Sequence, residues 1–134
     1  MARYNANGDT GRFAQVVELF APDAVMETQG DAGFVTYEGR DAIESIFTGA
    51  KVRFGADAAS RSVAPYLRHH TSTLQIDLID ETHAIGRCYY QVLMVHGLDH
   101  WGRYFDRYEQ RDGRWLFTHR RVTTDGRSAL VPRS

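Results

Sequence analysis

An α+β fold is predicted by the way two periodicities divide the chain. Apolar residues recur at helical spacing only in the first half, whereas long stretches of strand-forming residues separated by turn signals fill the second half. The pair Asp112-Gly113 is a strong signal for a two-residue hairpin in that second half. We therefore expect helices packed on one face of a curved, antiparallel sheet.

The helical elements are predicted from the apolar spacing near the N-terminus. From Thr10 onward, apolar side chains fall at i, i+3, i+4 and i+7, which predicts a helix that has Thr10 as its N-cap and ends near Pro22. Glycines 8 and 11 bracket Asp9, so a shorter helix should break there, with Asp9 at the junction. Helical spacing resumes over residues 39–47, and a loop rich in small and polar residues is expected over 55–62.

Six strands are predicted by alternation and β-forming residues. In chain order they cover residues 24–27, 33–37, 67–79, 83–96, 100–111 and 114–123. The turns between them are predicted at residues 30–33, 80–82, 97–99 and 112–113.

Length and composition indicate one domain. The chain has 134 residues, of which 43% are hydrophobic, enough for one core and too few for two ordinary domains. We assign this domain to residues 1–128 and interpret 129–134 as the remnant of an expression tag.

Charge and cysteine content limit which binding partners and which cellular location are expected. The net charge of -1 arises from 16 basic and 17 acidic residues without a long run of either sign, so neither nucleic acid nor a membrane surface is an expected partner. Cys88 is the single cysteine, which excludes an internal disulfide and agrees with a cytoplasmic location. No cofactor is expected, and the remaining partners are a small hydrophobic substrate and further copies of this chain.

Four short motifs occur in a characteristic order. They are GDTGRF at 8–13, LFAPDAV at 19–25, YEGRDAI at 37–43 and GRYFDRY at 102–108. Through this order and spacing, from about Tyr4 to Val122, the chain resembles SnoaL-like members of the nuclear transport factor 2-like superfamily. Their dehydratase and dehydrochlorinase branch contains scytalone dehydratase, bile-acid dehydratase and lindane dehydrochlorinase. The resemblance implies a cone-shaped, strongly curved and mostly antiparallel sheet.

The resemblance also implies a catalytic site. In that branch an aspartate at the break after the first helix orients a histidine at the start of the third strand, and these positions match Asp9 and His69. Tyr4 matches a tyrosine of the bile-acid enzyme, and Arg120 matches an arginine on the last strand of several members. Thr73 departs from the pattern, because an asparagine is common there.

The chemistry of these residue types fits proton abstraction from carbon. Histidine, with an unperturbed pKa of about 6.5, can act as a general base near neutral pH, and a carboxylate behind it stabilises the imidazolium as it forms. The alternative is structural: Asp9 would cap the helix that begins near Thr10, and His69 would pair across the sheet. Arg120 has two open roles as well, either binding an oxyanion or pairing with Asp106 or Glu109 on the neighbouring strand.

Strand alternation separates the two adjacent histidines. His69 and His70 should point to opposite faces, and we place His69 in the pocket on the family spacing. Alternation sets His69 opposite the apolar residues that follow it in the strand, a conflict that a bulge or a partner subunit on the outer face would resolve. His96 and His100 are expected to flank a hairpin at the sheet rim, and no His-x-His or HExxH spacing predicts a metal site.

Three functions are compatible with these residues. The first is a cofactor-independent lyase or isomerase in which an Asp9–His69 dyad removes a proton from a hydrophobic, cyclic small molecule, assisted by Tyr4 and Arg120. The second is a non-catalytic binding or assembly domain of the same fold. The third is an epoxide-hydrolase-like enzyme, for which Asp106 with Arg120 would supply the second carboxylate and its arginine. An apolar outer sheet face would also make the protein a homo-oligomer, a dimer or trimer.

Overall fold

The computed structural model describes residues 1–58 and 67–129. Within them the helices are α1 (Ala2–Asp9), α2 (Phe13–Val17) and α3 (Arg40–Ala58). The strands are β1 (Phe20–Gly30), β2 (Gly33–Glu38), β3 (Leu67–Leu78), β4 (His83–Met94), β5 (Gly97–Arg111), β6 (Arg114–Val122) and β7 (Gly126–Arg127). No helix in these described ranges is long and apolar enough to cross a membrane.

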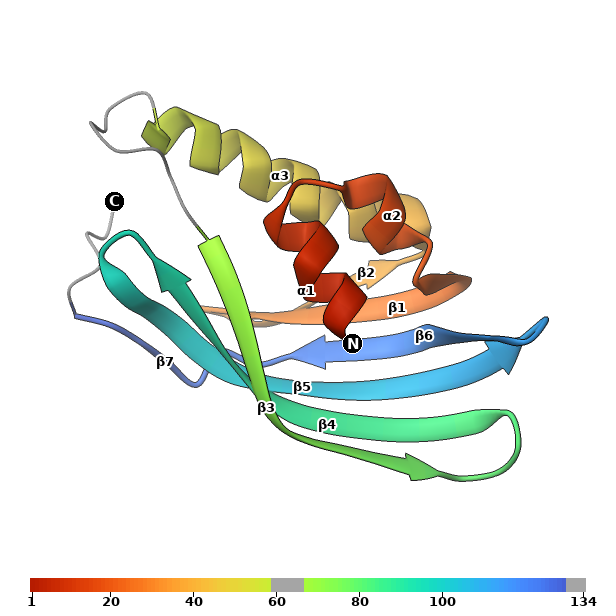
Figure 1. Ribbon diagram of the computed structural model, residues 1–134. Helices are drawn as coiled ribbons and strands as arrows, with labels where there is room; N and C mark the ends of the chain where they lie inside the picture. Colours follow the sequence, from red (N-terminus) through yellow and green to blue (C-terminus); the bar gives the residue numbers. More distant parts are fainter. Residues whose placement is uncertain (59–66, 130–134) are drawn as a thin grey trace.

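The strands form one strongly curved sheet, and the helices lie together over its concave face (Figure 1). The strand order is β2-β1-β6-β5-β4-β3, and the short β7 pairs with β5. Neighbouring strands run antiparallel except β1 and β6, which are parallel. The predicted α+β class, with a mostly antiparallel curved sheet and N-terminal helices, is confirmed.

The second helix is shorter than its apolar spacing predicted. It ends at Val17, and Phe20 begins β1 instead of completing the helical stripe. Two contacts explain this: the Phe117 N–H donates to the Leu19 carbonyl at 2.8 Å, and Phe20 stacks on the Phe117 ring at 5.1 Å between centroids. Pro22 favours an extended residue before it, which also opposes a helix here.

Three further local predictions were wrong. The N-cap of α2 is Arg12 and not Thr10. The Thr10 hydroxyl instead donates to the Ala6 carbonyl at the end of α1. The turn predicted at 97–99 lies at residues 95–96, so that Asp99 is inside β5. Residues 55–58, predicted to belong to a loop, form the last part of α3 instead. Residues 59–66 and the proposed tag residues 130–134 lie outside the described ranges.

A bulge in β3 resolves the conflict in strand alternation. The pairing of β3 with β4 shifts register between Ser72 and Gln75, and Thr73 has a φ of +57°. Before the bulge His69 pairs with the buried Val92, and after it Ile76 pairs with Gly86, so both lie on the concave face. The bulge therefore gives β3 an inward-facing histidine and inward-facing apolar residues in one strand.

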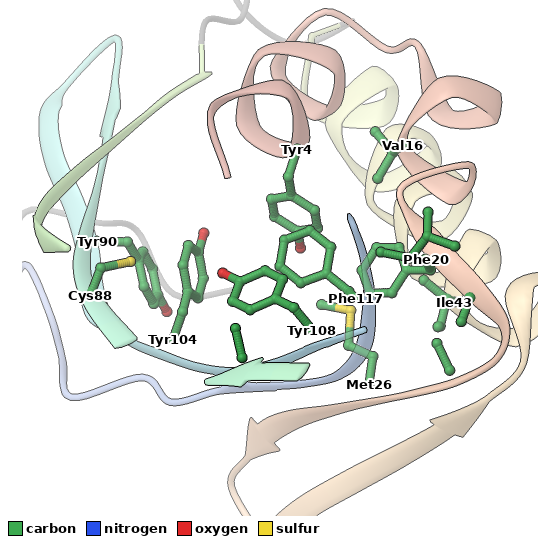
Figure 2. Packing of buried hydrophobic residues seen from close by; sticks show 14 of the residues in the cluster. Tyr4, Val16, Phe20, Met26, Ile43, Cys88, Tyr90, Tyr104, Tyr108 and Phe117 are labelled. Atoms are coloured by element: carbon green, nitrogen blue, oxygen red, sulfur yellow. The ribbon is translucent and has the colours of Figure 1, made fainter. Parts of the chain in front are cut away.

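The core is centred on an arginine that is fully enclosed by aromatic rings. Arg120 on β6 donates from Nε and Nη2 to the two carboxylate oxygens of Asp106 on β5, at 2.7 and 3.0 Å. Its guanidinium carbon lies 4.1, 3.9 and 4.5 Å from the ring centroids of Tyr4, Tyr104 and Phe117. Figure 2 shows how these rings crowd the space between α1 and the sheet. Burial alone would lower the pKa of Arg120, but Asp106 outweighs it and raises that pKa.

Replacing Asp106 by alanine should destabilise the protein by about 3–5 kcal/mol, because it leaves the enclosed guanidinium without its counter-charge. Urea denaturation measures the change in the free energy of unfolding. The matched control is Asp125→Ala, which breaks the half-exposed pair with Arg103 and should cost less than about 1 kcal/mol. Equal losses in the two variants would contradict a special role for the buried pair.

Candidate active site

The structure brings Asp9 and His69 into direct contact although they are far apart in sequence. Asp9 Oδ1 lies 2.6 Å from His69 Nδ1, and Asp9 Oδ2 accepts a hydrogen bond of 2.9 Å from the His69 backbone N–H. The Asp9 side chain is 8% exposed and that of His69 is 23% exposed. With both carboxylate oxygens engaged, the imidazole is held in one orientation, with Nδ1 toward Asp9.

The dyad depends on where α1 ends and how it lies on the sheet. Asp9 is the last residue of α1, Thr10 closes the helix, and Gly11 turns the chain with a φ of +77° that favours glycine. Four residues before Asp9, the Asn5 amide oxygen accepts a hydrogen bond from the Tyr104 hydroxyl at 3.3 Å. The alternative role of Asp9 as a cap is not seen, since no side chain caps α2.

A cavity of about 570 Å³ opens beside the dyad. Its polar groups include Asp9, His69 and His100, while most of the remaining wall is apolar. The apolar and aromatic lining residues are Tyr4, Phe13, Met26, Ile46, Phe47, Ala50, Leu67, Tyr90, Tyr104 and Val122. His70 points to the opposite, convex face of the sheet, beside Tyr89 and Trp101. The volume and lining suit a small apolar molecule held by a few polar groups.

Tyr4 and Arg120 lie differently with respect to the cavity. Tyr4 contributes to the cavity wall, but only 6% of it is exposed and its ring packs on Arg120. Arg120 does not line this cavity; of the two roles left open for it, the structure shows the ion pair with Asp106. The same enclosure removes Asp106 and Arg120 as the carboxylate and arginine of an epoxide hydrolase site.

A second histidine in the cavity was missed by sequence reasoning. His100 was expected at the sheet rim, yet it lies on the cavity wall, with its Nδ1 2.6 Å from Asp99 Oδ2. Asp99 Oδ1 also lies 2.9 Å from His96 Nε2, an ion-pair distance without the alignment of a hydrogen bond. The adjacent letters Asp99-His100 were visible in the sequence, but the turn placed at 97–99 excluded Asp99 from the strand that was predicted to begin at His100.

Tyr90 lies between the two histidines. Its ring centroid is 6.2 Å from that of His69 and 6.0 Å from that of His100, and its hydroxyl donates to the Thr123 carbonyl at 2.7 Å. Thr123 can approach this closely because Gly102 has no side chain: a Cβ there would lie 1.9 Å from the Thr123 carbonyl oxygen. Burial raises the pKa of the Tyr90 hydroxyl, which keeps it protonated at neutral pH.

The cavity contains no evident metal site. Among the residues that the structure describes, no group of three or more histidine, cysteine or carboxylate side chains is arranged to hold a metal ion. The polar groups in this part of the molecule are instead organised as aspartate–histidine pairs.

Comparison with protein families identifies the chain. A family model described as a SnoaL-like domain matches residues 1–121, nearly the whole chain. The protein belongs to the SnoaL-like family. No curated protein sequence matches this SnoaL-like chain.

Solved structures agree with this SnoaL-like assignment. A putative scytalone dehydratase from Novosphingobium aromaticivorans is 23% identical, with a TM-score of 0.75 over 98% of this chain and 83% of its own. LinA is 18% identical, with a TM-score of 0.76 over 99% of this chain and 87% of its own. A protein from Catenulispora acidiphila in complex with S-DNPA is 26% identical, with a TM-score of 0.74 over 92% of this chain and 87% of its own. The superfamily predicted from the four motifs is confirmed.

Replacing Gly102 by alanine should destabilise this SnoaL-like domain by about 1–3 kcal/mol, because the new Cβ would displace the Thr123 backbone that holds Tyr90. Thermal and urea unfolding measure the loss. The control is Gly30→Ala, where the nearest atom to a Cβ is a backbone oxygen at an ordinary 3.5 Å. If Gly102→Ala is as stable as Gly30→Ala, Thr123 does not need this close approach.

Proposed function

We propose that the protein is a cofactor-independent lyase or isomerase in which His69 removes a proton from carbon and Asp9 orients it. The observation that supports this most directly is the 2.6 Å contact between the two side chains at the wall of an apolar cavity. A base with its orienting carboxylate in place, beside a space for a substrate, is the arrangement that proton abstraction requires.

In this proposal each ring nitrogen of His69 has its own role. Because Asp9 accepts the proton of His69 Nδ1, the lone pair of the neutral imidazole is on Nε2, which has no hydrogen bond to any described residue. Nε2 takes a proton from a carbon next to a carbonyl or ring, and the C–H electron pair shifts toward that acceptor or expels a leaving group. The Asp9 carboxylate stabilises the imidazolium that forms, and the proton later leaves Nε2 for product or solvent.

The cavity wall suggests the class of substrate. Aromatic and aliphatic side chains surround the histidines. A hydrophobic, cyclic molecule that displaces water from the cavity would bury apolar surface against these side chains, which favours its binding. The cavity volume of about 570 Å³ lies in the range of sites that bind small molecules. Dehydration, elimination and isomerisation share the same first step, and all remain within this proposal.

Tyr4 and Arg120 enter the proposal differently. Arg120 has a structural role in this proposal, because it is paired with Asp106 and does not line the cavity. Tyr4 stays a candidate for polarising the substrate, because it lines the cavity. Relatives of this fold support a small-molecule function in general: one is a putative scytalone dehydratase and another was solved in complex with S-DNPA.

Replacing His69 by alanine should lower proton abstraction by about 10²–10⁴-fold, the usual contribution of a general base. Solvent exchange is a suitable assay: the protein is incubated with cyclic ketones and hydroxy-enones in D₂O, and deuterium at the acidic carbon is measured by NMR. His70→Ala, on the opposite face of the same strand, should leave the rate unchanged. Exchange at the native rate in His69→Ala would exclude His69 as the base. Binding without exchange in the native protein would favour the non-catalytic alternative.

We also propose that the convex face of the sheet joins copies of the chain. Tyr89 and Ile85 on this face are 55% and 40% exposed. Arg87 and Arg107 share the hollow beside them with the acidic Asp77. A face that carries apolar residues together with both signs of charge can contact the sheet face of another copy of the chain.

Light scattering should therefore give a mass of two or three times the 15.2 kDa of one chain. Tyr89→Lys should shift the protein toward monomer by placing a charge in the interface. The control is Val35→Lys at the exposed edge strand β2, where Val35 is 49% exposed. A monomeric native protein would contradict this interface.

A further inference from the structure

The cavity contains one imidazole more than the proposed reaction uses. His69 projects from β3 and His100 from β5, and Tyr90 on the intervening strand β4 lies between them. Each histidine has its own carboxylate at 2.6 Å, Asp9 for the first and Asp99 for the second. The cavity is therefore bounded by two aspartate–histidine pairs, and only the first has a role in proton abstraction.

Asp99 determines which nitrogen of His100 faces the cavity. The side chain of Asp99 is 9% exposed, and an ionised carboxylate only accepts hydrogen bonds, so the proton of a neutral His100 lies on Nδ1. Burial, assisted by the positive charge of Arg127 and by His69, lowers the pKa of His100 although Asp99 opposes this, so that the ring is neutral at neutral pH.

The Nε2 lone pair of His100 is then an acceptor without a donor. None of the described residues donates a hydrogen bond to it. The hydroxyl of Tyr90, whose ring lies beside that of His100, already donates to the Thr123 carbonyl. A half-buried acceptor in an apolar wall favours a ligand that brings its own donor, because a ligand without one leaves the acceptor unpaired and desolvated.

We propose that His100 Nε2 accepts a hydrogen bond from a hydroxyl group of the ligand, so that the cavity selects apolar ring compounds that carry an alcohol, enol or phenol O–H. His69 and His100 then contact two different groups of one molecule, an acidic carbon and a hydroxyl. The inference rests on this cavity being the ligand site, as in the proposed function, but it does not depend on catalysis by His69.

Two matched probes test the hydroxyl selection. 2-Naphthol carries an apolar ring system and one O–H donor, whereas 2-methoxynaphthalene has the same rings and no donor. Their dissociation constants are measured by calorimetry at neutral pH for the native protein, His100→Leu and the control His70→Leu. The ratio of the two constants, compared between proteins, removes the difference in hydrophobicity of the probes. In the native protein and in His70→Leu the preference for 2-naphthol should exceed that in His100→Leu by about 2–10-fold, the net contribution of one neutral hydrogen bond.

A second variant tests the same inference without changing the shape of the ligand wall. In Asp99→Asn the amide can donate as well as accept, so the proton of His100 is no longer confined to Nδ1, and the preference for 2-naphthol should fall toward that of His100→Leu. Two-bond ¹⁵N–¹H NMR spectra report which nitrogen carries the proton, and the native His100 should show it on Nδ1.

The outcomes separate this inference from the proposed function. If the preference is the same in the native protein, His100→Leu and Asp99→Asn, while both probes bind, His100 is not the acceptor and the inference alone fails. If neither probe binds the native protein, the cavity is not a site for apolar ring compounds, and both proposals fail. If His69→Ala keeps the naphthol preference but loses deuterium exchange, the two histidines have the separate roles assigned to them.

Discussion

The candidate site depends on the fixed position of α1 on the sheet, and the buried Arg120 holds α1 in that position. Its guanidinium is paired with Asp106 and enclosed by Tyr4, Tyr104 and Phe117, so that one charge joins α1 to β5 and β6. A buried cation of this kind costs desolvation and tolerates few alternative arrangements. Because Tyr4 is fixed on Arg120, the end of the same helix brings Asp9 against His69. Arg120 acts on the site through position, although it does not touch the cavity.

The second requirement of the site is a concave sheet face that carries both apolar side chains and histidines, and the curved sheet provides this face. The bulge at Thr73 lets β3 present His69 at one end of this face and Ile76 at the other, although strict alternation would separate them. β5 contributes Asp99 and His100 from the strand two places away. The two histidines lie on the strands that flank Tyr90, each paired with an aspartate, and this two-point arrangement supports the substrate features that we propose.

The family and the fold could be read from the sequence, but several details could not. The short motifs, the hairpin at Asp112-Gly113 and the break at Asp9 are local signals, and each corresponds to a feature of the structure. The helical stripe ending at Phe20 failed because pairing with β6 and stacking on Phe117 outweigh a weak helical preference. The turn placed at 97–99 failed by two residues, and this error left Asp99, the partner of His100, outside the predicted strand.

The sequence by itself determined the order of most helices and strands and, through the family resemblance, implied the pairing of Asp9 with His69, since such a resemblance transfers order and spacing along the chain. Only the tertiary structure decided which polar groups share a space. It enclosed Arg120 with Asp106, removed that arginine from the cavity, and brought His100 to it. The physical reason is that burial and hydrogen bonding join residues from different strands, and a bulge of one residue reverses which face a side chain occupies. Local spacing cannot report either effect.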